Sequence, residues 1–585
     1  MSVFKRTNSI LSKRWYYLVG GFISLLIVDF MQLLVPKIVQ YVIDDLSSSS
    51  LTDDKLFKYL IYLLIITGVI AVFRFFWRFF IIGNALVIEK HLREMIYDKL
   101  LILHKKFFNN NKTGDLMAHA NNDVSAVRMV YGFGFIAFFD ALILTITAIV
   151  FMVDIDFKLT VLAFIPLPII SIFIAYFGKV THKRFKDSQD SFSDLSGVAQ
   201  ESFAGIRVIK GYSLEEYDYN KFKKQSMDLL IKNVSLAKVW GLFHPFMSMI
   251  IGLSSAIIIY VGGRGAILNQ LTIGEFVALN TYIGLLSWPM MAIGFIINIY
   301  QRGKASMERI NRILDTEPEI KNEDHCIEIA PEPAHVEFKN VCFTHEGANS
   351  KVLNDMSFKA EKGQKIAIIG RTGSGKSTII NLLTRMYDRD SGSITINGHD
   401  VRSMKLDNLR DFISLVPQET FLFSESIKEN INYSGKTDKI EEIENISKTA
   451  GIYDNIMDFK DKFETELGEK GVNLSGGQKQ RVSIARALLK DSPIIILDDS
   501  LSAVDTHTER LIWSNLKPVL SEKTVIIITH RISSITDCDR IYVIDDGKVA
   551  EMGTHEQLIK HNGIYNDIYE KQQIEEKLSE NGGEE

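Results

Sequence analysis

Six long apolar stretches in the first half of the chain limit its fold more than any other feature. They lie at residues 15–35, 57–82, 129–153, 159–177, 239–261 and 273–300. A helix of about 20 predominantly apolar residues is long enough to cross a bilayer. No comparable stretch follows Tyr300 in this sequence of 585 residues. The sequence therefore predicts an α-helical domain with six membrane spans, followed by a soluble region.

The loops between these spans differ in length and charge. Those at residues 44–55, 154–158 and 262–272 are short, whereas those at 83–128 and 178–238 are long and rich in Lys and Arg. Because positively charged loops stay on the cytoplasmic side, we expect the long loops and both termini there. Both long loops contain a break, at residues 109–114 and 205–212, where a helix could turn and lie across another domain.

A few charged residues fall inside the spans. Arg74 and Arg78 are one helical turn apart, and Asp29 and Asp140 lie in the first and third spans. A charge near the bilayer centre costs about 2.5–3.5 kcal/mol, so these side chains should face protein or a watery cavity. For the arginines, packing or snorkelling is the favoured interpretation. Asp29 and Asp140 are equally compatible with packing and with a substrate path. Trp288-Pro289 should bend or interrupt the sixth helix.

Composition limits the other possibilities. The net charge of −5 provides no basic surface for nucleic acid. The three cysteines show no paired or metal-ligand spacing, which indicates a reducing compartment. A Glu- and Pro-rich segment at residues 315–333 is typical of a linker. We thus expect a membrane domain at 1–314, a soluble domain at 334–572 and a disordered polar tail at 573–585.

The soluble domain contains the sequence GRTGSGKST between an apolar run and a helical pattern. Glycines at a strand-to-helix turn let backbone N–H groups surround phosphate oxygens, which is how a P-loop binds nucleotide. Lys376 would reach the β- and γ-phosphates, and the Ser377 hydroxyl would bind Mg²⁺. A Gly/Ser-rich surface turn is the alternative. The predicted ATP-binding residues here are Gly370, Arg371, Thr372, Gly373, Ser374, Gly375, Lys376, Ser377 and Thr378.

Two further apolar runs end in polar residues. The run at 494–497 ends in Asp498, which is suited to hold Mg²⁺, and the run at 525–529 precedes His530. Buried strands that deliver polar side chains at their carboxyl ends are typical of a parallel α/β sheet that binds ligands at that edge. Between them, LSGGQ precedes a helical pattern at 479–489 and offers a second anion site at a helix N-terminus.

The order of these motifs resembles the nucleotide-binding domain of an ABC (ATP-binding cassette) transporter. The set comprises the P-loop, Gln418 in LVPQETFLF, TELGEKG at 465–471, LSGGQ, IIILDD, SAVD at 502–505 and His530. The six preceding spans resemble the membrane domain of the multidrug and lipid exporter branch. The similarity covers nearly the whole chain, with one domain of each kind, as in a half-transporter. A soluble ABC ATPase is excluded by the six spans.

This resemblance implies a dimer with Mg²⁺ and ATP bound between the P-loop of one chain and the LSGGQ of the other. Gln418 would contact Mg²⁺ and sense the γ-phosphate, and His530 would hold the γ-phosphate and the attacking water. The residues that would bind the partner's ATP are Ser475, Gly476, Gly477 and Gln478. ATP binding would close the two domains, and the loops near 111–118 and 205–214 would transmit that motion to the membrane domain.

Two positions depart from the family pattern. Asp499 stands where a catalytic Glu is expected, and His345 replaces the aromatic residue, usually Tyr, that stacks on adenine. The missing methylene withdraws the carboxylate by about 1.5 Å, and a misplacement of about 1 Å can cost 100-fold in rate. Asp499 therefore predicts weak hydrolysis, as in the weak-site subunit of heterodimeric exporters, and His345 predicts a weaker or less base-selective site.

Three functional interpretations follow. The favoured one is a subunit of an ATP-driven exporter that moves amphipathic drugs or lipids outward, paired with a different half-transporter that carries the catalytic Glu. A homodimeric exporter that tolerates Asp at both sites is the second. The third is a mainly regulatory subunit that binds ATP and sets the state of its partner or of a channel-like pore.

Overall fold

The computed structural model describes residues 3–581, with gaps at 269, 324, 331, 333, 469–470 and 505. The chain divides into two compact units. The first contains Met1–Ile102 and Asn111–Thr316, and the second contains Leu103–Asn110 and Glu317–Glu585.

The first unit is helical, and within the described residues it contains six helices long and apolar enough to cross a membrane. The chain begins with the short helix α1 (Lys5–Lys13). The first two long helices are α2 (Trp15–Ser47) and α3 (Asp53–Ile102). The third is formed by α5 (Thr113–Ala118), η1 (His119–Asp123), α6 (Val124–Met129), η2 (Val130–Gly134) and α7 (Phe135–Ile155). The fourth is formed by α8 (Phe157–Phe164) and α9 (Leu167–Ala204), the fifth by α11 (Glu215–Ile257), η3 (Ile258–Gly262) and α12 (Gly263–Ile267), and the sixth by α13 (Ile273–Leu285) and α14 (Ser287–Asp315).

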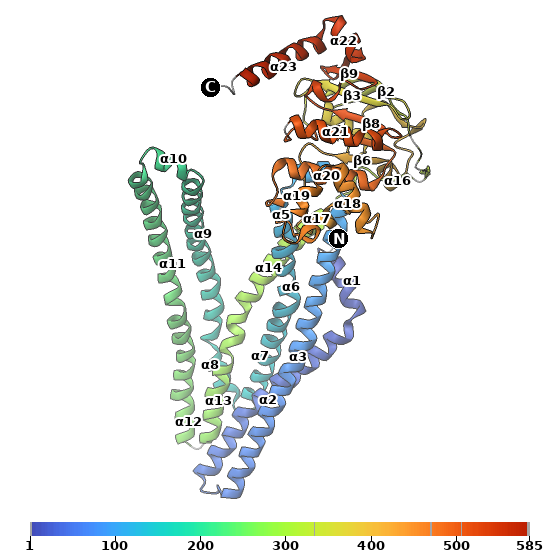
Figure 1. The fold of residues 1–585 in the computed structure, drawn as a ribbon. Coiled ribbons are helices and arrows are strands. Elements are labelled where there is room, and N and C mark those ends of the chain that lie inside the picture. Colours follow the sequence, from blue (N-terminus) through green and yellow to red (C-terminus); the bar gives the residue numbers. More distant parts are fainter. Residues whose placement is uncertain are drawn as a thin grey trace. The chain divides into compact units, whose positions relative to one another are not determined.

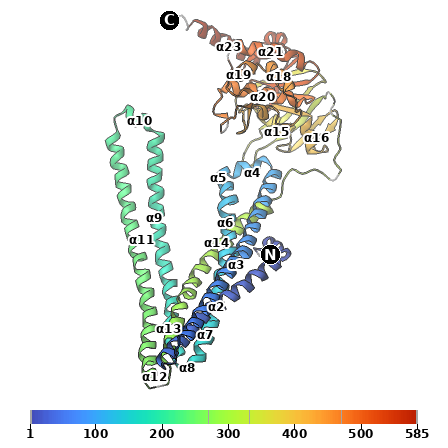
Figure 2. The same cartoon turned by 60° about the horizontal axis from the view of Figure 1, so that its bottom comes forward.

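These helices are longer than the predicted apolar spans and continue into the charged loops. In both views α9 and α11 run side by side away from α2, α3 and α14, and α10 (Ile206–Gly211) joins their ends (Figures 1 and 2). The predicted break at 205–212 is therefore a short helix between two long ones. The predicted interruption of the sixth helix is also present, because α13 ends at Leu285 and α14 begins at Ser287.

Small residues allow close helix packing in the first unit. A Cβ atom on Gly21 of α2 would lie 2.5 Å from the Ile81 side chain of α3, and one on Gly274 of α13 would lie 2.3 Å from the Gln40 carbonyl oxygen of α2. Small residues at helix contacts are a general means of association in membranes, where the hydrophobic effect between helices is weak. Beyond the apolar spans, the Arg309 guanidinium donates to the Asp123 carboxylate and links α14 to η1.

The second unit is built on two sheets. A six-stranded sheet has the order β10-β9-β3-β8-β7-β6, with neighbours from β9 to β6 parallel and β10 antiparallel to β9. Its strands are β3 (Lys365–Gly370), β6 (Ile413–Val416), β7 (Ile494–Asp498), β8 (Thr524–Ile528), β9 (Arg540–Asp545) and β10 (Lys548–Gly553). A four-stranded antiparallel sheet has the order β2-β1-β4-β5 and contains β1 (Val336–Phe343), β2 (Leu353–Ala360), β4 (Ser391–Ile396) and β5 (His399–Asp400).

Helices and two apolar cores surround the parallel sheet. The helices are α15 (Lys376–Leu383), α16 (Leu406–Asp411), α17 (Ile427–Ile431), α18 (Ile440–Thr449), α19 (Tyr453–Met457), α20 (Gly476–Lys490), α21 (Thr506–Leu520), α22 (His555–His561) and α23 (Ile564–Asn581), with the 3-10 turns η4 (Lys462–Glu464) and η6 (Ile532–Ser534). Alternate residues of β7 join different cores, Ile495 on one face and Ile496 on the other. Strands buried on both faces read as continuous apolar runs, which is why the sequence revealed them.

One helix of the second unit comes from the first half of the chain. The six-residue α4 (Lys105–Asn110) follows α3 in sequence but belongs to the second unit. Its Lys106 ammonium contacts the carboxylates of Glu319 and Glu346 at 2.5 and 2.9 Å, and Asn109 Nδ2 donates to the Tyr387 hydroxyl at 2.8 Å. The predicted break at 109–114 is thus the end of a helix that lies across another domain.

The unit boundary and the tail differ from the sequence prediction. The second unit begins at Glu317, within the predicted linker, because Ile327 pairs with Met404 and Ile327 and Ile329 pack on one of the apolar cores. The polar tail, expected to be disordered, forms the end of α23 as far as Asn581. Its Glu and Lys residues have high helix propensity, which accounts for the difference.

Candidate nucleotide-binding site

The P-loop joins β3 to α15 and adopts the conformation that its glycines allow. Gly373 and Gly375 have φ of +85° and +100°, which is the left-handed region open to glycine. A Cβ atom on Gly370 would lie 2.3 Å from the Ile544 carbonyl oxygen, and one on Gly375 would lie 2.6 Å from the Leu353 side chain. The loop therefore requires these glycines, and it leads into the N-terminus of α15, where backbone N–H groups are free for an anion.

Lys376, the first residue of α15, is 7% exposed. Its ammonium donates to the carbonyl oxygens of Gly370 and Arg371, both at 2.8 Å, and so lies along the loop that would surround a phosphate. Burial lowers the pKa of Lys376, while Asp498 and Asp499 oppose that shift. A buried cation that donates to two neutral carbonyls is well suited to exchange them for phosphate oxygens.

A cavity of about 260 Å³ brings most of the predicted residues together. It is lined by Val352, Thr372, Gly373, Gly375, Lys376, Ser377, Thr378, Gln418, Asp498, Asp499, Ile528 and His530. The strands β7 and β8 are adjacent and parallel, so their carboxyl ends deliver Asp498 and His530 to the same edge. The sequence had not singled out Val352 and Ile528, which are apolar and carry no chemical signal.

The charges in this cavity interact strongly. Burial raises the pKa of Asp498 to about 6, the nearby Asp499 adds to this effect, and Lys376 opposes it. Burial and Lys376 lower the pKa of His530, whereas Asp499 raises it. The Asp498 carboxylate, the Ser377 hydroxyl and the Gln418 amide oxygen are oxygen ligands of the kind that Mg²⁺ prefers. The donor set thus fits a Mg²⁺ ion, whose charge would hold Asp498 ionised.

The backbone of Asp499 is fixed from two sides. It has a φ of +47°, its N–H donates to the Ile528 carbonyl oxygen at 2.7 Å, and its own carbonyl accepts from the Ser502 hydroxyl at 2.9 Å. Gln480 of α20, which is 5% exposed, donates to Ser502 Oγ and supports the same turn. Because this backbone is held in place, the length of the side chain at position 499 decides how far its carboxylate reaches.

The LSGGQ residues lie at the N-terminus of α20 and line a different surface. Ser475 caps the helix, accepting from the Gln478 N–H at 3.3 Å, and Gln478 Oε1 accepts from the Ser475 N–H at 2.9 Å. A Cβ atom on Gly477 would lie 3.0 Å from the Ala503 carbonyl oxygen. None of Ser475, Gly476, Gly477 and Gln478 lines the P-loop cavity of the described chain. The TELGEKG and SAVD motifs are described only in part, since residues 469–470 and Asp505 lie outside the described residues.

Comparison with known proteins identifies the chain. The profile of the ABC transporter transmembrane region matches residues 18–290, and the ABC transporter profile matches residues 353–502. The chain is 38% identical over 574 residues to the probable multidrug resistance ABC transporter ATP-binding/permease protein YheI of Bacillus subtilis, covering 98% of both chains. The chain belongs to the ABC transporter family.

Other relatives agree with this assignment. The chain is 34% identical over 581 residues to the multidrug resistance-like ATP-binding protein MdlA of Escherichia coli, covering 99% and 98% of the two chains. It is 33% identical over 582 residues to the ATP-dependent lipid A-core flippase of Desulfotalea psychrophila, covering 97% and 100%. A bacterial Atm1-family ABC exporter solved with ATP bound has a TM-score of 0.78 and 26% identity, covering 97% and 99%. The chain is an ABC exporter half-transporter, a multi-pass membrane protein with an ATPase domain.

His345 lies outside the P-loop cavity of this half-transporter. It lines a separate cavity of about 750 Å³ together with residues of α4, among them Lys106 and Asn109. Its ring meets Phe343 and Tyr387 edge to face, with centroids 4.8 and 5.4 Å away. The structure therefore places His345 beside the helix that comes from the first half of the chain, which the sequence did not predict.

The charged residues of the apolar spans have different surroundings. Asp29 is 1% exposed, and its carboxylate oxygens accept no hydrogen bond from the described residues. Asp140 accepts a hydrogen bond from Trp288 Nε1 at 2.9 Å. Arg74 donates to the Gln32 amide oxygen at 3.3 Å, and the Arg78 guanidinium lies 5.4 Å from the Trp77 ring centroid. The pairing of Asp140 with Trp288 was missed, because the sequence pointed to Trp288 only as part of a bend.

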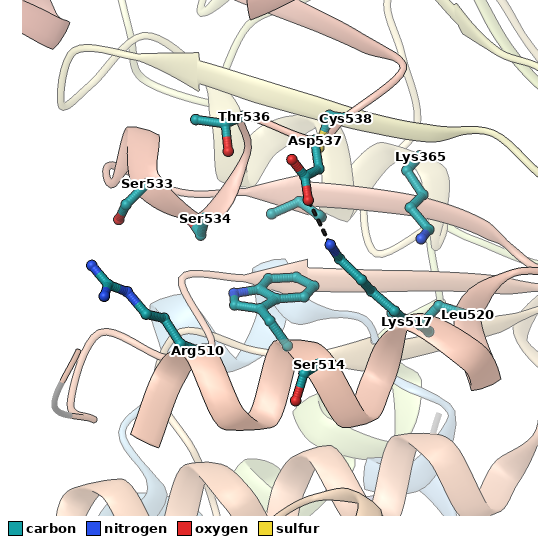
Figure 3. Close-up of a pocket in the computed structure, with 12 residues that line it drawn as sticks. Lys365, Arg510, Ser514, Lys517, Leu520, Ser533, Ser534, Thr536, Asp537 and Cys538 are labelled. Carbon is teal, nitrogen blue, oxygen red and sulfur yellow. Dashed lines mark hydrogen bonds and ion pairs between the residues drawn. The ribbon is translucent and has the colours of Figure 1, made fainter. Parts of the chain in front are cut away.

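Another cavity of the ATPase domain, of about 230 Å³, contains none of the predicted site residues. Figure 3 shows Lys517 of α21 paired with Asp537 at its rim, with the ammonium 2.6 Å from the carboxylate. Cys538 also lines it, and burial raises the pKa of that thiol to about 12, so it stays protonated and unreactive.

Proposed function

We propose that this chain is the weak-ATPase-site half of a heterodimeric exporter that moves amphipathic drugs or lipids out of the cytoplasm or inner leaflet. Its relatives are named as multidrug resistance transporters and lipid A-core flippases, which supports this class of cargo. In this proposal both termini face the cytoplasm. Asp29 and Asp140 belong to the region of the membrane domain through which cargo passes.

The observation that supports the heterodimer proposal is the fixed backbone of Asp499. The Ile528 carbonyl and the Ser502 hydroxyl hold the chain on both sides of this residue. The backbone therefore does not advance to compensate for the shorter side chain, and the carboxylate stays about 1.5 Å short of the place that Glu would reach. Water activation at this site is weak as a result.

ATP and Mg²⁺ still bind at the weak site. The P-loop N–H groups and Lys376 would hold the phosphates, and Ser377, Gln418 and Asp498 would hold the metal, which supplies a positive charge for the phosphate oxygens. Asp499 would orient the attacking water, and His530 would hold the γ-phosphate through its ring. His345 would contact the adenine.

The second composite site depends on this chain's LSGGQ. Ser475, Gly476, Gly477 and Gln478 are absent from the lining of the chain's own P-loop cavity, which supports a role toward ATP held by another chain. The capped N-terminus of α20 presents backbone N–H groups to an anion. A partner with a catalytic Glu would hydrolyse ATP at that site, and this chain's P-loop site would mainly hold nucleotide.

The experiment is ATP turnover in lipid by the chain alone, by the chain with its partner, and by Asp499→Glu in both settings. We expect little turnover alone, substantial turnover with the partner, and an increase of about tenfold or more for Asp499→Glu alone. Asp537→Glu adds the same methylene at an exposed position and should change nothing. Brisk turnover by the unmodified chain alone would instead support the homodimer.

A further inference from the structure

The cavity of about 230 Å³ in the ATPase domain contains none of the residues proposed to bind ATP. One wall is a face of α21, and the opposite wall is the segment between β8 and β9. Figure 3 shows the opening between them, with Arg510 on α21 and Ser533 on the opposite segment. Pockets for small molecules generally have about 300–1,000 Å³. This cavity is slightly smaller and therefore fits a molecule with a single ring.

The lining of this cavity carries an excess of positive charge. Its described residues include the cations Lys365, Arg510 and Lys517 but one carboxylate, Asp537, which pairs with Lys517 at 2.6 Å. Arg510 and Lys365 form no ion pair with any described residue. Figure 3 shows these two cations on opposite sides of the Lys517–Asp537 pair. Two cations without a carboxylate partner suit a ligand with two anionic groups.

The rest of the lining includes a large apolar surface. Trp513 lies about one turn from both Arg510 and Lys517 on the same face of α21. Leu520 and Ile527 belong to a buried core, and Trp513 packs against it. An indole offers a flat face on which another aromatic ring stacks favourably. An inorganic anion would leave this surface uncovered, so the lining favours an aromatic anion.

Trp513 also separates this cavity from the turn that carries Asp499. Together with Ile527 and Ser534, it lines a second hollow of about 10 Å³, whose other walls include Asp499 and Ser502. The Trp513 indole N–H is buried and has no acceptor among the described residues. Packing rather than a hydrogen bond therefore positions the ring, and a ligand that covers it acts on the wall of the Asp499 turn.

A chain of polar contacts also leads from α21 to this turn. Glu509, the neighbour of Arg510, is 5% exposed and accepts from the Arg531 guanidinium at 2.7 Å. Arg531 donates to the Ser502 carbonyl oxygen at 3.1 Å, and the Ser502 hydroxyl donates to the Asp499 carbonyl oxygen at 2.9 Å. A shift of α21 is therefore passed to Asp499.

The same turn contacts the helix that begins at LSGGQ. Gln480 Nε2 of α20 donates to Ser502 Oγ at 3.1 Å, and Gln480 Oε1 accepts from the Ala503 N–H at 3.1 Å. The turn thus connects the cavity behind Trp513 with both ATP-binding surfaces of this chain.

We propose that this cavity is an effector site for a small aromatic molecule with two anionic groups. One anionic group contacts Arg510, the other contacts Lys365, and the ring stacks on Trp513. Since Arg510 lies on α21 and Lys365 begins β3, the bound molecule ties the helix to the sheet, opposes movement of the Asp499 turn and slows ATP turnover. The binding site does not depend on the proposed export function, whereas the effect on turnover rests on it.

Binding is tested on the full chain with its partner in lipid, with isophthalate and terephthalate as probes. These two benzenedicarboxylates differ only in the spacing of their carboxylates. Trp513 is the only tryptophan of the second unit, and subtracting the fluorescence of Trp513→Phe isolates its signal. At least one probe should bind about tenfold more tightly than neutral terephthalamide and inorganic phosphate. If neither does, or if phosphate binds equally well, the proposal is wrong.

The assigned contacts are tested by removing one charge at a time. Arg510→Gln and Lys365→Gln should each weaken binding of the better probe by about tenfold, because each loses a charge-assisted contact. Lys548→Gln, at an exposed position of β10, removes a charge elsewhere and should leave the affinity unchanged. Equal affinity in the wild type and all three variants would place the probe outside this cavity and overturn the assignment.

The link to the ATP sites has two readouts. A probe concentration just sufficient to saturate the wild type should lower phosphate release by the complex about fivefold, and Arg510→Gln should be inhibited less. Because coupling between two binding sites is reciprocal, a non-hydrolysable ATP analogue with Mg²⁺ should also weaken probe binding. This second readout needs no turnover, so it decides the link even if the complex is inactive and the proposed function fails. Probe affinity that nucleotide leaves unchanged contradicts the effector role.

Discussion

The aspartates of the P-loop cavity and those of the membrane spans have different surroundings. In the ATPase domain, Asp498 and Asp499 line a cavity of about 260 Å³ with Lys376 and a set of oxygen ligands. In the membrane domain, Asp29 is 1% exposed and accepts no hydrogen bond from the described residues, whereas Asp140 accepts one from Trp288. The cavity of the ATPase domain suits a divalent cation at Asp498, whereas burial without a partner makes a charge on Asp29 costly. The same side chain is thus surrounded by polar groups in one unit and buried without a partner in the other.

The largest expected effect tests Lys376, the cation that lines the same cavity as Asp498 and Asp499. Lys376→Ala removes the ammonium that would hold the phosphates, so ATP binding and turnover by the complex should fall by about 100-fold. Equilibrium binding of a fluorescent ATP analogue and phosphate release measure this. Lys362→Ala, at an exposed position before β3, is the matched control. A small effect of Lys376→Ala would mean that the P-loop does not contact the phosphates.

The second prediction concerns the proton and the metal at Asp498. Since its pKa is about 6, protons compete with Mg²⁺ below this pH, and the apparent Mg²⁺ affinity should fall about tenfold per pH unit there. Titrating Mg²⁺ against bound nucleotide from about pH 5 to about pH 8 measures this. Asp498→Asn should bind Mg²⁺ weakly and lose the pH dependence, whereas His530→Ala should keep it. A wild-type profile that is flat through pH 6 contradicts the raised pKa.

The third prediction compares Asp29 with Asp140 by stability. Asp29→Leu replaces a buried group without hydrogen bonds by an apolar one, so the free energy of unfolding should rise by about 1–3 kcal/mol. Asp140→Leu should not stabilise the protein, because it leaves the Trp288 N–H without its acceptor. Thermal unfolding in the same detergent compares the two variants. If Asp29→Leu destabilises, Asp29 has a favourable partner that the structure does not show.

The smallest expected effect concerns contact with the adenine base of ATP. His345→Tyr restores a larger aromatic ring beside Phe343 and Tyr387, and stacking of about 1 kcal/mol should tighten ATP binding by about fivefold. The preference for ATP over GTP should rise with it. His325→Tyr, outside both the P-loop cavity and the α4 cavity, controls for the added ring. No change in either quantity would mean that His345 does not contact the base.

Much of this architecture was predictable because buried parallel strands and P-loops leave strong local signals. The apolar runs before Asp498 and His530 indicated buried strands of a parallel sheet, and the pairing of β7 with β8 brings their ends together. Six apolar stretches likewise indicated six helices. What failed depended on contacts between distant parts of the sequence. The pairing of Ile327 with Met404 has no local signature, so the sequence did not show that this part of the predicted linker contacts the second unit.

The polar contacts of the membrane domain show the same limit. Asp29 and Asp140 were recognisable as unusual because charges are rare in apolar spans. Their surroundings were not, since helix packing decides which side chains meet, and Trp288 lies 148 positions from Asp140 in the sequence. Trp288 attracted notice through the proline that follows it, yet its contact is with Asp140. Sequence identified the individual groups, and the fold supplied their pairing.

The membership of α4 in the second unit has a practical consequence for dissecting the protein. A cassette cut from residue 317 onward would lack Lys106 and Asn109, which contact Glu319, Glu346 and Tyr387. Such a fragment would leave open a hollow of about 750 Å³ that part of α4 lines. The smallest self-sufficient cassette is therefore discontinuous in sequence. A synthetic peptide of residues 103–110 added to the fragment would supply the missing piece, and a graft through a short linker would make it a single chain.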